Sequence, residues 1–170
     1  MRSIQGQTAR YLSTAAVIIA SCALAVNTAS AQQKQTLLFN VPATSSKYTQ
    51  QHVIDVGDVP GHQVRVYELQ RIYPADTPKI EGVRFAESWT RGYSDYTDLN
   101  GPSVVYNVYL LEGGDKIFAR SDLVAQSETQ SDGSRKTSTV GVSRITGGTG
   151  KFRGIQGTVK SLTTADSRPG

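Results

Sequence analysis

The sequence predicts an all-β protein, an eight-stranded antiparallel β-barrel, and three observations support this prediction. Turn-forming residues recur between short runs that are rich in β-branched and aromatic residues. Within several of these runs, side chains alternate between apolar and polar, which is the period of a strand with one buried face. No segment after residue 31 shows the apolar spacing of an amphipathic helix.

Each expected strand is bounded by turn signals. The expected ranges are 36–41, 49–55, 63–73, 80–93, 103–112, 115–126, 135–146 and 153–163. Segments 100–102, 113–115 and 132–133 contain Gly, Asn or Asp, which tolerate the positive φ of tight turns. Segment 74–78 begins and ends with proline and is expected to be a loop. Consecutive hairpins predict an antiparallel meander.

Residues 1–31 have the pattern of a signal peptide. Arg2 and Arg10 precede an apolar stretch at 15–26, and the small residues at 29–31 form a cleavage site. The apolar stretch has about 12 residues, fewer than the ~20 that a transmembrane helix needs. We therefore expect an exported protein without a transmembrane segment.

The mature chain is then one β-barrel domain at 32–170, which is periplasmic or secreted. An alternative processing route is open, because residues 19–22 resemble a bacterial lipoprotein cleavage box. In that case Cys22 would carry the lipid that anchors the protein.

The composition of the mature domain argues against several classes of site. Without Arg2 and Arg10, the mature domain has 16 Lys and Arg residues and 14 Asp and Glu residues, so its formal charge is +2. Such a small, scattered surplus does not predict a nucleic-acid partner. The domain has no cysteine and only His52 and His62, so no disulfide or structural zinc site is expected. The glycine-rich run at 147–150 fits neither a phosphate loop nor a dinucleotide loop, and no cofactor is expected.

The fourth expected strand contains the candidate catalytic residue. Strict alternation places Phe85, Glu87 and Trp89 on one face, together with Arg91. A carboxylate between two aromatic rings would be desolvated, which raises its pKa and suits general acid–base catalysis. The alternative is a structural ion pair between Glu87 and either Arg91 or Arg120.

Aromatic residues in the middle strands are candidates for lining a small-molecule site. Tyrosine combines apolar area with a hydrogen-bonding group, and it also packs barrel interiors. The candidate ligand-binding residues are Phe85, Trp89, Tyr93, Tyr106, Arg120 and Leu123. The strand at 103–112 is apolar on both faces, which indicates a subunit contact or a packed terminus on the outside.

The stretch Thr146–Gly157 reads Thr-Gly-Gly-Thr-Gly-Lys-Phe-Arg-Gly-Ile-Gln-Gly. It resembles the late-barrel motif of allene oxide cyclases and plant dirigent proteins. Val56–Val59 and the hairpin Ser103–Gln126 are similar to the same family, so the resemblance covers about residues 36–163. It implies a calycin-like barrel whose interior is filled by side chains or holds one small ligand, in a family that often forms trimers. We therefore expect a homo-oligomer, either a trimer or a dimer.

Five glycines of this motif are expected to serve the turn between the last two strands, with Phe152 closing one end of the barrel. They are Gly147, Gly148, Gly150, Gly154 and Gly157. The chain departs from the cyclases elsewhere. No acidic residue occurs between Gln32 and Ile54, where they carry a carboxylate, and Leu123 stands where they carry a pocket tyrosine.

These observations lead to one functional hypothesis and two alternatives. The hypothesis is that the barrel binds a small lipophilic or aromatic molecule in its interior. The first alternative is a cyclase or isomerase that acts on such a molecule there, assisted by Glu87 or a tyrosine. The second is a structural envelope protein without catalytic activity. The sequence leaves open whether the protein is an enzyme.

Overall fold

Strands make up most of the part of the chain that the structure describes. The computed structural model describes residues 35–167, which contain two short 3-10 helices and eight strands. In chain order these are η1 (Ala43–Ser45), β1 (Ser46–Asp55), β2 (His62–Ile72), β3 (Lys79–Ile80), β4 (Val83–Thr97), β5 (Gly101–Leu111), β6 (Lys116–Thr129), β7 (Arg135–Gly148), η2 (Gly150–Phe152) and β8 (Gly157–Ser167). The predicted signal peptide at 1–31 and the alternative lipid site at Cys22 lie outside the described residues.

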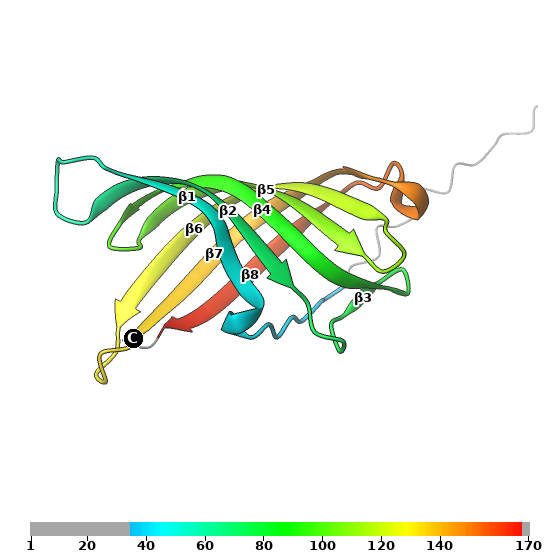
Figure 1. Cartoon of the computed structure of the whole chain (residues 1–170), viewed down its shortest axis with the longest axis horizontal. Coiled ribbons are helices and arrows are strands. Elements are labelled where there is room, and N and C mark those ends of the chain that lie inside the picture. Colours follow the sequence, from blue (N-terminus) through cyan, green and yellow to red (C-terminus); the bar gives the residue numbers. More distant parts are fainter. Residues whose placement is uncertain (1–34, 168–170) are drawn as a thin grey trace, which may run out of the picture. The chain divides into compact units, whose positions relative to one another are not determined.

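The strands form one antiparallel sheet in the order β1-β2-β4-β5-β6-β7-β8, and β3 pairs with the start of β4. Every neighbouring pair is antiparallel, and most pairs are consecutive in the chain. Figure 1 shows that the sheet is strongly curved, with β6, β7 and β8 running together. The predicted all-β class and the eight-stranded antiparallel sheet are confirmed.

The predicted closure of the sheet into a β-barrel is wrong. β1 and β8 lie at its two ends, and within the described residues neither strand has a partner on its other side. A closed eight-stranded barrel needs eight strands whose lengths and stagger are compatible. β3 has only two residues, and the segment 36–41, expected as the first strand, is not a strand. Within residues 35–167 the sheet therefore has two free edges.

A β-bulge in β4 overturns the predicted alternation of its side chains. Phe85 pairs with Leu111 and Glu87 pairs with Leu110, so Ala86 is an extra residue in the ladder. Because strand side chains alternate with a period of two, one extra residue moves all later side chains to the opposite face. Phe85 and Glu87 therefore lie on opposite faces of the sheet.

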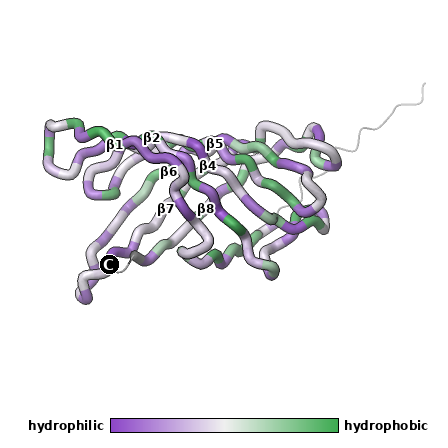
Figure 2. The backbone as a smooth tube through the Cα atoms, in the orientation of Figure 1, coloured by the Kyte–Doolittle hydropathy of each residue, from purple (hydrophilic) through white to green (hydrophobic). Residues whose placement is uncertain are grey.

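The two faces of the sheet differ in burial and chemistry. We call the face that carries Phe85 the inner face and the face that carries Glu87 the outer face. The inner face buries small polar residues: Ser88, Ser94, Ser103, Asn107, Ser121 and Ser143. The outer face exposes large apolar residues, among them Val66, Tyr93, Tyr106, Val140 and Leu162. Hydrophobic and hydrophilic residues are interspersed along the strands (Figure 2).

The hydrophobic core lies at one end of the inner face. It consists of Tyr73, Phe85, Leu111, Ile117 and Phe152. The segment 36–41 packs against it through Leu37 and Val41, and the ring centroid of Phe39 is 5.3 Å from that of Phe85. Burying these apolar side chains explains why the segment covers the core instead of extending the sheet.

Phe152 is 3% exposed in this core, and replacing it with Ala is expected to lower the free energy of unfolding by about 3–5 kcal/mol. The loss combines apolar transfer with the cavity that the truncation leaves. Urea unfolding followed by circular dichroism measures it. Leu38 is 85% exposed, and Leu38→Ala is the control, with an expected change below about 0.5 kcal/mol. Equal stability of the two variants would contradict this assignment of the core.

Candidate functional site

A ladder of hydrogen-bonded polar side chains crosses the inner face. The Thr90 hydroxyl donates to Oδ1 of Asn107 at 2.7 Å, and Nδ2 of Asn107 donates to Oγ of Ser121 at 3.1 Å. The hydroxyls of Ser121 and Ser143 are 2.7 Å apart. The ladder joins β4, β5, β6 and β7, and it satisfies polar groups whose burial without partners would be costly.

Nε of Arg65 and Oγ of Ser94 are buried on the inner face and have no hydrogen-bond partner among the described residues. The register of β2 and β4 places these two residues directly opposite each other. Arg65 also donates through Nη2 to Oε1 of Gln63 at 2.8 Å. Because a buried polar group without a partner costs about 1–3 kcal/mol, a polar ligand group at this position would be stabilised.

Tyrosines flank this pair on the same face. Tyr67 and Tyr96 are two residues away from Arg65 and Ser94 along their strands, and Tyr48 packs edge to face on Tyr67 with ring centroids 5.6 Å apart. Burial raises the pKa of Tyr67, and the neighbouring Tyr96 and Tyr48 raise that pKa further. Tyr67 therefore keeps its proton at neutral pH and acts as a hydrogen-bond donor.

A second arginine and tyrosine lie on the inner face nearer the core. Arg71 donates through Nε to Oγ of Ser46 at 3.1 Å. Burial raises the pKa of Tyr109 to about 12, an effect that Tyr73 increases and Arg71 opposes. Like Tyr67, Tyr109 is a neutral donor at physiological pH.

The inner face carries an excess of positive charge. Among the described strand residues, the register places Arg65, Arg71 and Arg135 on this face with one carboxylate, that of Asp55. The Asp55 carboxylate lies at the end of β1 and accepts a hydrogen bond from Nε2 of Gln63 at 2.8 Å. Arginine binds carboxylates and other oxyanions through its fork of N–H donors. The face therefore suits a ligand with anionic or hydroxyl groups.

Glu87 lies on the outer face and does not reach this site. Its Oε1 accepts a hydrogen bond from Nε2 of Gln70 at 2.6 Å. Nε of Arg91 pairs with Oε2 of Glu68 at 2.7 Å. The expected ion pair of Glu87 with Arg91 is therefore not formed.

The other candidate ligand-binding residues are divided between the two faces. Four lie on the outer face: Trp89, Tyr93, Tyr106 and Arg120. Two lie on the inner face: Phe85 and Leu123. Nη1 of Arg120 pairs with Oδ2 of Asp122 at 2.6 Å, so Arg120 is not the partner of Glu87 either. The structure does not bring the six residues into one site.

Sequence reasoning missed Arg65, Tyr67 and Ser94. A signal was present in β2, where Arg65 and Tyr67 alternate with Val64 and Val66. The usual rule buries the valines and exposes the arginine, whereas Val66 is 59% exposed and Arg65 is half-buried. The inner face is thus the more polar face of this strand.

The glycine-rich stretch spans the end of β7, η2 and the approach to β8. Gly154 has a φ of 79°, in the left-handed region that favours glycine. A Cβ atom at Gly148 would lie 2.7 Å from the carbonyl oxygens of Lys116 and Phe152. This close backbone approach brings Phe152 into the core.

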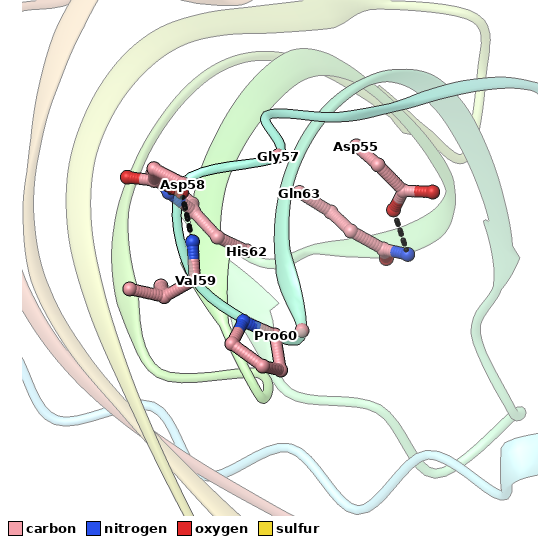
Figure 3. Close-up of a pocket in the computed structure, with 8 residues that line it drawn as sticks. Asp55, Gly57, Asp58, Val59, Pro60, His62 and Gln63 are labelled. Carbon is pink, nitrogen blue, oxygen red and sulfur yellow. Dashed lines mark hydrogen bonds and ion pairs between the residues drawn. The ribbon is translucent and has the colours of Figure 1, made fainter.

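An open hollow of about 430 Å³ lies at the hairpin between β1 and β2 (Figure 3). Asp55, Asp58, His62 and Gln63 contribute to its lining. Nδ1 of His62 is 2.6 Å from Oδ1 of Asp58, and its Nε2 is 2.7 Å from Oδ1 of Asp95. Hydrogen bonds to Asp95 and Asp58 raise the pKa of His62, and the bond to His62 lowers that of Asp58. The imidazole therefore links the hairpin turn to β4, and we call these two contacts of His62 the clip.

No family model matches the chain, and no curated protein or solved structure matches it either. Across residues 35–167, no group of three or more His, Cys, Asp or Glu side chains is placed to hold a metal ion. No helix in this part of the chain has the length and apolar character to span a membrane. The chemistry of the inner face is therefore the basis for the functional argument.

Replacing Asn107 with Ala is expected to lower the free energy of unfolding by about 1–3 kcal/mol. The change removes the acceptor of Thr90 and a donor to Ser121 in the middle of the ladder. Urea denaturation measures it. Gln126→Ala on the exposed side of β6 is the control and is expected to be within about 0.5 kcal/mol of the parent. An Asn107→Ala protein as stable as this control would show that the ladder contributes little.

The imidazole of His62 is expected to titrate above its ordinary pKa of 6.5 in the folded protein. A raised folded pKa means that the clip stabilises the fold fully below the unfolded pKa, and that this stabilisation is lost as pH rises through the folded pKa. NMR titration of the ring protons measures the midpoint. Asp95→Asn is expected to lower it, and a midpoint at or below 6.5 in the parent protein would contradict the clip.

Proposed function

We propose that this protein binds a small aromatic molecule with an anionic or hydroxyl group on the inner face of its sheet. The observation that carries the proposal is the opposed pair of buried, unpartnered atoms, Nε of Arg65 and Oγ of Ser94. An oxyanion accepts hydrogen bonds from a guanidinium and a hydroxyl together. Binding would therefore satisfy both groups at once.

The aromatic part of the ligand follows from the residues around this pair. Tyr67 and Tyr96 flank it, and Tyr48 packs on Tyr67. Tyrosine rings provide flat apolar area for edge-to-face or offset stacking with an aromatic ligand. Nε of Arg65 and Oγ of Ser94 disfavour a purely lipophilic molecule, because such a ligand would leave both atoms without hydrogen-bond partners.

Binding without catalysis is the form of the proposal that the side chains favour. Acid–base catalysis needs a group whose proton moves near neutral pH. Tyr67 and Tyr109 hold their protons because burial raises their pKa values, and Glu87 is on the other face. The resemblance to allene oxide cyclases and dirigent proteins supports a small-molecule ligand, and a cyclase or isomerase is the alternative proposal from the same resemblance.

The test uses two fluorescent probes of similar shape, anilinonaphthalene sulfonate and its uncharged parent, phenylnaphthylamine. Arg65→Gln is expected to raise the Kd of the sulfonate about 10-fold, because a hydrogen bond to a charged group contributes about 1.5–3 kcal/mol. The Kd of the uncharged probe is expected to change less than about twofold. Fluorescence titration measures both constants.

Arg153→Gln is the matched control, because it removes the same charge from an exposed residue beyond η2. The proposal fails if Arg65→Gln and Arg153→Gln bind the sulfonate equally well. It also fails if Leu162→Ser on the outer face abolishes binding, because the probe would then be bound to the outer face. Thermal unfolding of each variant checks that the fold is intact.

A further inference from the structure

The outer face carries two exposed apolar patches, and each lies beside a different free edge of the sheet. The basic patch is near β8 and consists of Val124, Val140, Val142, Arg144, Lys160 and Leu162. The acidic patch is near β1 and consists of Ile54, Asp58, Val66, Tyr93 and Asp95. The large apolar residues in both patches lie on a face that a monomer of this chain leaves uncovered.

The basic patch is a continuous surface across β6, β7 and β8. Val140 pairs with both Val124 and Leu162, and Val142 pairs with Lys160. Leu162 is 71% exposed and Val140 is 52% exposed. Arg144 and Lys160 are exposed, and neither forms an ion pair with another described residue. This patch therefore combines apolar area with two free positive charges.

The acidic patch has the same construction with the opposite charge. Val66 pairs with Tyr93, and these residues are 59% and 50% exposed. Ile54 lies beside them on β1 and is 55% exposed. Asp58 and Asp95 keep 55% and 49% of their side-chain surface although both contact His62. Two carboxylates share one imidazole, so the patch is negative at neutral pH.

The free edges add a second reason to expect a partner. β1 and β8 each leave one row of backbone N–H and C=O groups without a strand beside it in the described part of the chain. Long exposed edges of this kind readily pair with another strand. β8 extends from Gly157 to Ser167 without a proline or a register shift, so neither a missing N–H group nor a bulge interrupts its edge.

We propose that the β8 edge of one molecule pairs with the β1 edge of a second copy of this chain, which brings the basic patch of the first molecule beside the acidic patch of the second. A symmetric contact between two basic patches would bring Arg144 and Lys160 against the same positive residues. A head-to-tail contact places unlike charges side by side on the outer face of the joined sheet, and it brings the apolar residues of the two patches next to one another across the new strand pair. Such heterologous contacts build rings when the rotation closes and filaments when it does not.

The experiment measures the mass of the full mature chain by size-exclusion chromatography with light scattering across a range of concentrations. The parent protein is expected to form species larger than a monomer. R144E/K160E is expected to raise the dissociation constant about tenfold or more, because two attractive contacts become repulsive. Adding D58K/D95K to R144E/K160E is expected to restore association, since both charges of the contact are then exchanged.

Two controls keep the result specific. K116E/R153E changes the net charge equally at exposed residues outside both patches and is expected to associate like the parent. Leu162→Ser weakens the apolar contact without changing the charge. Its dissociation constant therefore still tests the interface if D58K/D95K unfolds the hairpin between β1 and β2. Circular dichroism of each variant confirms that the fold is retained.

Several outcomes would overturn the proposal. One is a monomer at all concentrations, and another is an oligomer that R144E/K160E and Leu162→Ser leave unchanged. Hydrogen exchange separates the proposal from pairing of β1 with β8 in one chain, because protection of these edges should increase with protein concentration. A monomer that sediments with anionic phospholipid vesicles through Arg144 and Lys160 would assign the basic patch to a lipid surface instead.

Discussion

The β-bulge at Ala86 determines which side chains of β4 face inward, and both faces of the sheet depend on it. Before the bulge, Phe85 joins the hydrophobic core. After it, Ser94 lies on the inner face, and Trp89 and Tyr93 lie on the outer face. Without the extra residue, the charged and aromatic side chains of β4 would face inward. β4 would then contribute no side chain to the hydroxyl ladder. A single residue therefore separates the apolar end of the inner face from its polar middle.

The middle of the inner face is held by hydrogen bonds between small side chains. Ser94, Ser103 and Ser121 are no more than 2% exposed. Gly92 lies on the same face, and a Cβ atom at this position would lie 2.4 Å from the carbonyl oxygen of Val104. Buried hydroxyls need partners, and the ladder provides them across four strands. The proposed specificity for a polar ligand group rests on Nε of Arg65 and Oγ of Ser94, which the ladder leaves out.

The open edges of the sheet and the exposed apolar residues of its outer face have the same structural cause. Residues 36–41 cover the core and β3 is short, so the sheet lacks an eighth long strand that could help close it. An unclosed sheet keeps two hydrogen-bonding edges, and its outer face keeps valines and tyrosines in solvent. The opposite charges beside the two edges favour the proposed association with a second copy, which would pair both edges. The inner face is left available for a ligand in this arrangement.

The sequence by itself determined the class of the fold and the positions of most strands. Period-two alternation and glycine turns are local signals, and they located seven of the long strands to within a few residues. The segment 36–41 was misassigned because an apolar run looks the same whether it extends a sheet or covers a core. The candidate site was predicted least well, since strict alternation put Glu87 beside Phe85 and the candidate residues did not include Arg65, Tyr67 or Ser94. Bulges, sheet closure and the choice of buried face depend on contacts between distant strands, so only the tertiary structure decided them.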